Sequence, residues 1–402
     1  MPSEAAPEAS HTDTRAQRRR ETLTSRERVV RTLRREPVDR VPIDLGSHMS
    51  TGISAFAYAD LRRHLGFPTG RIWIPDLVQF LAAVDEDVRT RFHADCILLE
   101  PPWEETASWS PRHGYAFAVP SHFVSEQDAG GDWIVVQGDR RMRMPAGGYF
   151  FDGEWLSDWG RGSEEQRIAQ YAREAERIFK ETPYAMNFVG YSRGIGHGAY
   201  FEGLEQAVRM ISDPQDVIAE NERKCEQMIA RFRAVNAAMG CHIQLLTVGD
   251  DMGTQHGPLC NPKHIERFCM PYYRRFCRVV HAESDVKVFM HNCGAIRMLI
   301  PMLIEAGIDV LNPVQISADG MDPVALKSEF GDRITFWGGG CDTQRVLPAA
   351  SPAEVARHVA GQVGILKPGG GFVFTQVHNI LGNVPPENVV AMFDAAYEEG
   401  WY

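Results

Sequence analysis

The strongest constraint on the fold is a repeated alternation of short apolar runs with segments that begin at helix-capping residues. Runs of strand character begin near residues 41, 95, 184, 243, 286, 309, 334 and 372. Several of the segments that follow begin with a capping residue and then proline, as at Asn261-Pro262, Asp322-Pro323 and Ser351-Pro352. Strand–helix alternation gives a parallel sheet with right-handed crossovers. Eight such units predict an α/β protein with a closed (β/α)8 barrel of the TIM type, and an open doubly wound sheet is the alternative.

Two stretches depart from this alternation. Residues 1–22 are polar and rich in Ala, Pro, Glu and Arg, which predicts a flexible N-terminal tail. A helix is expected next, because Thr24 and Glu27 have the spacing of a capping box, and it forms an N-terminal helical extension. Aromatic and β-branched runs broken by glycine predict a β-hairpin insertion around 115–151, as a lid or a dimer contact. We therefore expect one barrel domain over 23–402 that carries this insertion.

Composition excludes several classes of partner. The formal net charge of −11 argues against nucleic acid, and no apolar run reaches the roughly 18 to 20 residues needed to span a bilayer. The first residues contain no apolar stretch typical of a secretory signal. The eight cysteines show no dense or paired pattern, which fits a reducing compartment better than a disulfide framework. We expect a cytoplasmic protein without nucleic-acid or membrane partners.

Polar side chains follow six of the expected strands. In a (β/α)8 barrel the active site lies at the carboxyl ends of the strands, so these side chains are expected to converge on one cavity. The candidates for substrate binding are Arg193, His197, Asp250, Gln255, Asn312, Gln315, Asp342 and Gln344. Asp251 and His378 are the candidates for catalysis as acid and base, and either aspartate of the Asp250-Asp251 pair could instead cap a turn.

The segment VFMHNCGA, residues 288–295, combines a strand end with two soft metal ligands. His291 and Cys293 project to the same side if the strand continues through Cys293. Imidazole nitrogen and thiolate sulfur together favour zinc, and a catalytic zinc has three protein ligands and one open position. Cys341 is the first candidate for the third ligand, and His378 and Asp251 are the alternatives. A buried thiol beside a hydrogen-bonded histidine is the interpretation without metal.

Two runs of three glycines, 338–340 and 369–371, match neither a P-loop nor a dinucleotide-binding fingerprint. They are better explained by close backbone approach in tight loops than by phosphate binding.

Several motifs together resemble the uroporphyrinogen decarboxylase superfamily. They are RERVVRTLRREPVDRVPIDLG, GDDMGTQHGPLCNP, HNCGAIRMLIPMLIEAGIDVLNPVQ, FWGGGCDTQ and PGGGFVFTQVHNILGNVPPENV. The similarity covers roughly residues 24–400, is most specific over 246–395, and is greatest to the branch of cobalamin-linked methyltransferases. It implies a (β/α)8 barrel, and since such proteins are often dimeric, we expect a homodimer.

The resemblance implies one of two chemistries. Decarboxylases of this family work without metal and hold propionates with arginines from a WxMRQAGR-like segment, whereas this chain has IDLGSHMSTG there. Of the active-site residues of the decarboxylases, this chain matches only a late histidine, with His378 after the last expected strand. The methyltransferase branch binds zinc through an HxC motif, which His291 and Cys293 match, and through a later cysteine in a PGCG-like final loop. Here that loop carries His378, and the nearest thiol is Cys341.

These observations favour a zinc-dependent methyltransferase that moves a methyl group between a small-molecule donor or acceptor and a corrinoid (cobalamin). The corrinoid is expected on a separate carrier protein, because the chain lacks a DxHxxG segment. The second hypothesis is a metal-independent decarboxylase or lyase that acts on a carboxylated small molecule through Asp251 and His378. The third is a non-catalytic protein that binds a tetrapyrrole or other small ligand.

Overall fold

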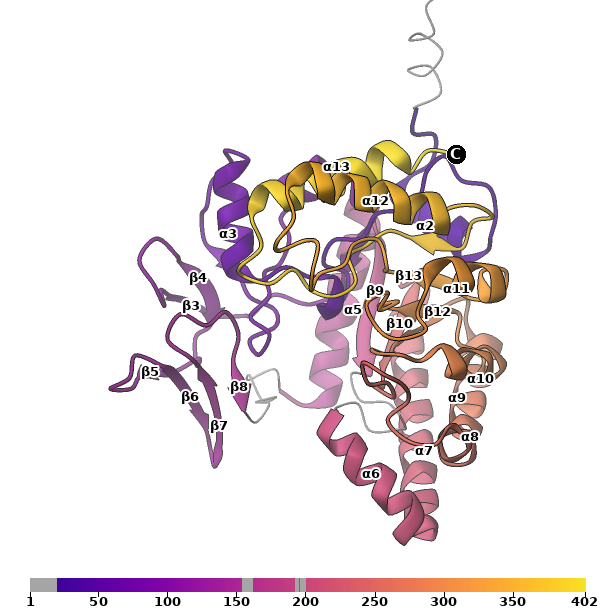
Figure 1. Cartoon of the computed structure of the whole chain (residues 1–402). Coiled ribbons are helices and arrows are strands. Elements are labelled where there is room, and N and C mark those ends of the chain that lie inside the picture. The colour runs from indigo at the N-terminus through magenta and orange to yellow at the C-terminus, as the bar shows by residue number, and fades with distance from the viewer. Residues whose placement is uncertain (1–19, 154–161, 192–194, 196–199) are drawn as a thin grey trace, which may run out of the picture.

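A curled parallel sheet organises the molecule. The computed structural model describes residues 20–153, 162–191, 195 and 200–402 (Figure 1). Seven parallel strands form one sheet in the order β14-β13-β12-β11-β10-β9-β2. They are β2 (Cys96–Leu98), β9 (Ala185–Tyr191), β10 (Leu245–Gly249), β11 (Lys287–His291), β12 (Val310–Asn312), β13 (Thr335–Trp337) and β14 (Phe372–Val373). Each lies within an apolar run that the sequence marks as a strand.

The first expected strand, 41–45, bridges the two edges of this sheet. Ile43 pairs in parallel with Phe374, next to β14, and the backbone N–H of Asp44 donates to the carbonyl of Phe374 at 2.8 Å. On its other side, the backbone N–H of Asp95 donates to the carbonyl of Ile43 at 2.7 Å, just before β2. The pairing is an isolated bridge rather than a full strand. The arrangement is consistent with a TIM-type fold.

The inside of the curled sheet is a packed core at its amino-terminal end. One side chain from each strand contributes to a buried cluster that also contains Val29 and Leu33 of α2 (Ser25–Leu33). The strand members are Cys96, Ala185, Leu245, Phe289, Val310, Trp337 and Val373. Complete burial of a large apolar side chain of this kind stabilises the fold by roughly 1.5–3 kcal/mol. The expected capping box of Thr24 and Glu27 is present, and it starts α2 where the helix can cover this end.

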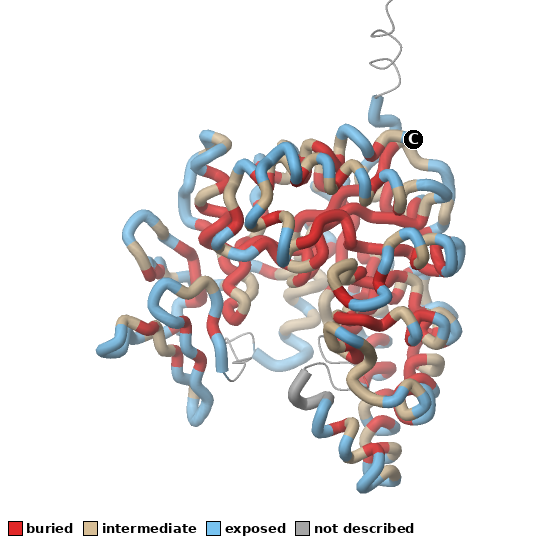
Figure 2. The backbone as a smooth tube through the Cα atoms, viewed as in Figure 1, coloured by how far each residue is buried: buried red, intermediate tan, exposed pale blue. Residues whose placement is uncertain are grey.

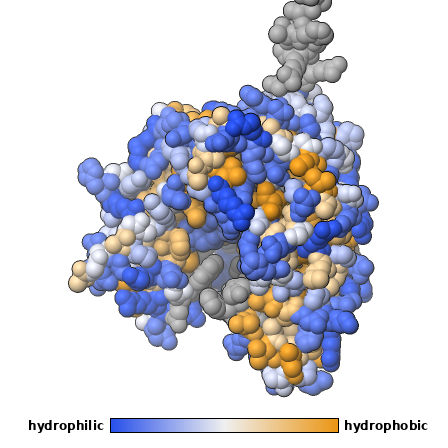
Figure 3. Space-filling model, in the orientation of Figure 1, coloured by the Kyte–Doolittle hydropathy of each residue, from blue (hydrophilic) through white to orange (hydrophobic). Residues whose placement is uncertain are grey.

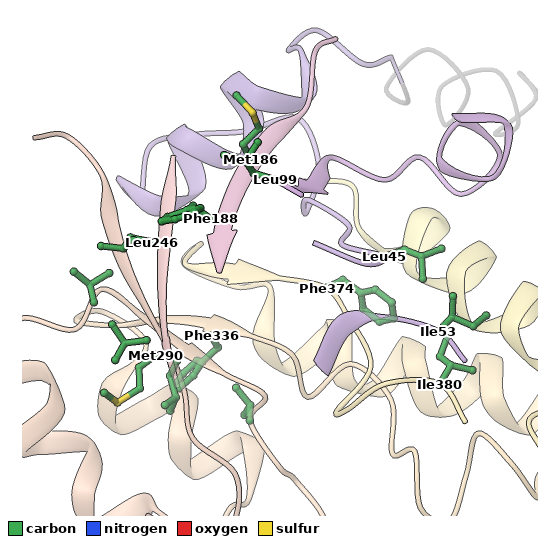
Figure 4. Close-up of a cluster of buried hydrophobic side chains, with 14 of the residues drawn as sticks. Leu45, Ile53, Leu99, Met186, Phe188, Leu246, Met290, Phe336, Phe374 and Ile380 are labelled. Atoms are coloured by element: carbon green, nitrogen blue, oxygen red, sulfur yellow. The ribbon is translucent and has the colours of Figure 1, made fainter. Parts of the chain in front are cut away.

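Alternate residues of the same strands point outward and pack under the helices. Leu246 and Met290 belong to this outer layer, shown in Figure 4, whereas their neighbours Leu245 and Phe289 belong to the inner cluster. This two-residue alternation is the periodicity of a strand buried on both faces. Figure 2 accordingly shows that the buried residues are concentrated in the strands, whereas the exposed residues lie on the outer turns of the helices.

The helices follow the strands along the chain. Besides α2 they are α3 (Ala55–His64), α4 (Glu86–Arg91), α5 (Glu164–Glu181), α6 (Tyr200–Ser212), α7 (Pro214–Met239), α8 (Pro262–Phe268), α9 (Met270–Glu283), α10 (Ile300–Ala306), α11 (Pro323–Phe330), α12 (Pro352–Leu366) and α13 (Pro386–Glu399). Two short 3-10 turns are η1 (Met49–Thr51) and η2 (Arg297–Leu299). Helices α7, α8, α11 and α12 begin at the prolines that the sequence marks as helix starts. Of the helices described here, none is long and apolar enough to span a membrane.

The region of the expected hairpin forms two small sheets that stand away from the main sheet (Figure 1). One contains β1 (Ile72–Trp73), β4 (Phe117–Pro120) and β3 (Thr106–Trp109), with β3 and β4 antiparallel. The other is an antiparallel meander of β5 (Ser125–Gln127), β6 (Trp133–Gln137), β7 (Arg140–Met144) and β8 (Asp152–Gly153). The strands therefore extend beyond the expected limits of 115–151.

One helix carries an exposed apolar face. Leu204, Val208 and Ile211 of α6 are 52%, 59% and 72% exposed. Figure 3 shows the corresponding apolar patch on the helix that projects below the rest of the molecule.

Candidate metal centre at the strand ends

Three potential metal ligands meet at the carboxyl ends of β11 and β14. The ligand atoms of His291, Cys293 and His378 all lie within 4.8 Å of one another. The Cys293 Sγ is 3.4 Å from the His291 Nε2, and the rings of His291 and His378 meet edge to face with centroids 5.8 Å apart. His291 is the last residue of β11 and His378 follows β14, so parallel strands bring together residues that are 87 positions apart in sequence.

Each of the two histidines makes a short hydrogen bond through its Nδ1. The His291 Nδ1 lies 2.7 Å from the Asn312 Oδ1, and the His378 Nδ1 lies 2.7 Å from the Asn379 Oδ1. Because an amide oxygen only accepts, both Nδ1 atoms carry a proton, and Nε2 is the ring nitrogen that can bind a metal ion. Two imidazole nitrogens and one sulfur are a donor set that suits Zn²⁺ and leaves a fourth position open.

Burial shifts the pKa values of His378 and Cys293 in the absence of a cation. Burial lowers the pKa of His378 to about 4, and neighbouring His291 acts in the same direction, so the imidazole is neutral at pH 7. Burial, with the negative charge of Asp251, raises the pKa of the Cys293 thiol well above its ordinary value. A divalent cation would reverse this preference for the thiol, since the thiolate is the form that binds metal.

Asp251 lies beside this cluster. Its Oδ1 accepts a hydrogen bond from the backbone N–H of Cys293 at 2.9 Å and is 3.8 Å from the His291 Nε2. The side chain remains 28% exposed. Asp251 is thus close enough to interact with a bound substrate or with a cation held by the three ligands.

His48 is a site residue that the sequence analysis does not identify. Its ring centroid lies 5.0 Å from that of His291 and 5.4 Å from that of Phe289. Burial lowers the pKa of His48 well below its ordinary value, with smaller contributions from His291 and His378, so it is neutral. The available signal was weak: His48 follows the first expected strand but belongs to no recognisable motif.

The structure does not bring Cys341, the first candidate for the third ligand, into this cluster. His378, the alternative, lies in the cluster with His291 and Cys293, whereas Cys341 is fully buried in the hydrophobic core with its Sγ 3.9 Å from the carbonyl oxygen of Asp342. The glycines before Cys341 explain this orientation. A Cβ on Gly338 would lie 2.0 Å from the Pro313 carbonyl oxygen, and one on Gly340 would lie 2.4 Å from the Phe374 ring. This close approach turns the loop into the core.

Several of the residues expected to bind substrate make hydrogen bonds that hold the loops around the cluster. The buried Asp250 carboxylate accepts a 2.5 Å hydrogen bond from the Tyr273 hydroxyl. Gln315 links two loops, because its Oε1 accepts from the backbone N–H of Gly294 at 2.8 Å and its Nε2 donates to the Gln255 Oε1 at 3.0 Å.

The remaining candidates lie at the end of β12, on the loop after β13, or outside the described residues. Asp342 accepts from the backbone N–H groups of Gln344 and Arg345, as in a turn cap, and the Gln344 side chain is exposed. Asn312 supports His291 as described above. Arg193 and His197 lie outside the described residues.

One solved structure shares this architecture over nearly the whole chain. A solved methyltransferase from Methanosarcina mazei matches over 93% of this chain and 98% of its own, with a TM-score of 0.55 and 16% identity, which indicates a shared fold. The 3-keto-D-glucoside 4-epimerase from E. coli matches 57% of this chain and 84% of its own, with a TM-score of 0.35 and 10% identity. No curated protein matches the sequence. The family model for uroporphyrinogen decarboxylase (URO-D) matches residues 197–399, half of the chain, and includes all three clustered ligands. The chain therefore belongs to the uroporphyrinogen decarboxylase family.

Proposed function

We propose that this protein is a zinc-dependent methyltransferase that moves a methyl group between a small molecule and a corrinoid. The observation that carries the proposal is the cluster of His291, Cys293 and His378 at the carboxyl ends of the strands. This end of a parallel α/β fold is where active sites form. The donor set of two neutral imidazoles and one thiolate suits a catalytic zinc with one open position.

Each residue of the cluster has a distinct role in this proposal. His291, Cys293 and His378 would hold the metal, which reassigns His378 from catalytic base to ligand. A bound Zn²⁺ would supply a Lewis acid that stabilises a substrate thiolate, or that polarises a methylated heteroatom. Asp251, partly exposed and 3.8 Å from the His291 Nε2, would accept the proton that a thiol or hydroxyl substrate releases on binding.

The net charge of the site indicates which substrates fit. Beside the Asp251 carboxylate, whose Oδ1 lies 3.8 Å from the His291 Nε2, one thiolate and two neutral imidazoles on a divalent cation would leave the ion and its three ligands with a net charge of about +1. A substrate that presents an anionic sulfur or oxygen would neutralise it. The corrinoid would be a co-substrate on a separate carrier protein.

Metal analysis together with a methyl-transfer assay tests the proposal. We expect about one zinc per chain, loss of that zinc in Cys293→Ser, and retention in the matched control Cys241→Ser, which removes an exposed thiol. Incubation with methylcobalamin and a panel of thiol and hydroxyl acceptors should change the cobalt spectrum in the wild type, and a chelator should prevent the change. Full activity of metal-free wild-type protein would refute the zinc mechanism.

A metal-independent decarboxylase or lyase is the alternative, and one observation favours it. Burial keeps His378 neutral, and His378 lies in the same cluster as His291 and Cys293, which are close to Asp251. Asp251 and His378 would then act as the acid–base pair. That activity would act on a carboxylated substrate, would survive chelation, and would be lost in His378→Gln but kept in Cys293→Ser.

A further inference from the structure

Each histidine of the cluster is supported by a chain of hydrogen bonds in which every donor points away from the cluster. Behind His378, the Asn379 Nδ2 donates to the Gln79 Oε1 at 3.0 Å, and the Gln79 Nε2 donates to the Asp76 Oδ2 at 3.0 Å. Asp76 also accepts hydrogen bonds from the backbone N–H groups of Val78 and Gln79. An ionised carboxylate can only accept hydrogen bonds. An acceptor at the far end fixes the orientation of both amides.

The chain behind His291 is built from other residues with the same direction. The Asn312 Nδ2 donates to the backbone carbonyl of Trp337 at 2.9 Å, so its Oδ1 must face the other way. That oxygen accepts from the His291 Nδ1 and also from the Ser50 hydroxyl at 2.7 Å. Asn312 is fully buried, and Asn379 is 8% exposed. Neither amide can rotate without leaving buried polar atoms unpaired, which costs roughly 1–3 kcal/mol each.

We propose that Asn312 and Asn379 are positioning residues, whose anchored amide oxygens hold His291 and His378 in the tautomer that presents Nε2 to a metal ion. The inference rests on the metal centre of the proposed function. It goes beyond that function by assigning a role to residues that would contact neither the metal ion nor the substrate. An amide fixes the tautomer without adding negative charge, whereas a carboxylate in the same place would lower the net positive charge of the centre. The cluster therefore stays matched to an anionic substrate.

Two substitutions at Asn379 distinguish the effect of the acceptor oxygen from the effect of losing the amide donor. Asn379→Asp keeps an oxygen for the His378 Nδ1–H, and Asn379→Leu removes it, while both lose the donor to Gln79. Zinc affinity, measured by competition with a chelating dye, should fall about 10- to 100-fold in Asn379→Leu and stay within a few-fold of the wild type in Asn379→Asp. Asn388→Leu is the matched control, because Asn388 is a buried asparagine that donates to carbonyls of Leu347 and Ala350 away from the cluster.

Ring-nitrogen NMR of the metal-free protein gives a second readout that does not depend on zinc. His378 of the wild type should carry its proton on Nδ1, and the Leu variant should show both tautomers. Equal zinc affinity in the wild type, Asp and Leu proteins, or a wild-type His378 protonated on Nε2, would overturn the positioning role. Absence of zinc binding in the wild type would instead overturn the proposed function, and the NMR result would still decide the tautomer.

Discussion

Gly294 allows the loops that carry Asp251 and Cys293 to touch through their backbones. It adopts φ +93°, and a Cβ built there would lie 2.6 Å from the backbone carbon of Gly253. A Cβ on Gly253 would lie 2.4 Å from the carbonyl oxygen of Cys293. The hydrogen bond from the Cys293 N–H to the Asp251 carboxylate depends on this close packing.

Gly294→Ala should therefore be more damaging than a glycine substitution at a similar φ in open space. Gly114 is the control, since its φ is +83° and a Cβ there meets nothing within 4 Å. We expect Gly114→Ala to lower the free energy of unfolding by about 1 kcal/mol, and Gly294→Ala by roughly 2–4 kcal/mol, because backbone overlap adds to the strain. Urea denaturation measures both, and equal losses would show that the loops separate easily.

At the scale of residues, the sequence indicated which side chains could bind a metal better than it indicated which of them lie close together. The sequence argument placed His291 and Cys293 on one face of a strand that continues through Cys293, but β11 ends at His291, and the loop after it brings the Cys293 Sγ to 3.4 Å from the His291 Nε2. The choice between Cys341 and His378 depended on how a glycine-rich loop turns against Pro313 and Phe374, which is a tertiary contact. Gln79 and Asn379 are 300 positions apart, and no local pattern indicates their hydrogen bond.

At the scale of elements, buried Asp95 joins three segments at the amino-terminal end of the sheet. Its carboxylate accepts from Arg28 of α2 at 2.6 Å, from Arg40 at 2.7 Å and from the backbone N–H of Ile43 at 2.8 Å. The side chains of Arg28, Arg40 and Asp95 are 0%, 2% and 0% exposed. The carboxylate therefore pairs with two buried guanidinium groups, which Asp39 and Glu21 also contact, and it fixes the bridging segment 41–45.

Asp95→Ala should leave those guanidinium groups short of a counter-charge. We expect a loss of about 3–5 kcal/mol in the free energy of unfolding, as is typical when one partner of a buried ion pair is removed. Glu176→Ala is the control, because the pair of Glu176 with Lys180 is exposed to solvent and should contribute little to stability. Chemical denaturation compares the two, and a loss at Asp95 as small as that at Glu176 would contradict the role of this ion pair.

The same end of the sheet should lose stability in acid. Burial acts to raise the pKa of Glu21, but hydrogen bonds with His93 and Arg40 and the charges of Arg40 and Arg28 lower it from 4.5 to about 2. A folded-state pKa below the unfolded one gives stability that is present above 4.5 and is lost as the pH falls toward about 2. The unfolding free energy should therefore drop less steeply over this range in Glu21→Gln than in the wild type. Parallel curves for the two proteins would contradict the prediction.

The positions of the elements were the most predictable part of the fold, for a physical reason. Strands buried on both faces are continuous apolar runs, and proline after a capping residue marks a helix start. The limits of the insertion were less predictable, because β1 at residues 72–73 pairs with β4 at residues 117–120 across a long stretch of chain. Such non-local pairing leaves little trace in local sequence.

At the scale of the whole molecule, a metal ion would connect distant parts of the chain. His291 and Cys293 follow β11, whereas His378 follows β14, with two strands between them in the sheet. Because the ligands come together only in the folded chain, binding of the ion favours the folded state over the unfolded one.

Removal of metal should therefore lower the thermal stability of the whole protein. Free zinc at about 100 times its Kd stabilises the fold by about 2.7 kcal/mol, which corresponds to roughly 3 °C in Tm for a chain of this size. Scanning calorimetry of the wild type with zinc and then with excess chelator should show this decrease, and Cys293→Ser should show almost none. The Cys241→Ser control should behave as the wild type, since that exposed thiol is not one of the clustered ligands. An equal chelator effect in Cys293→Ser and the wild type would place the stabilising metal elsewhere in the molecule.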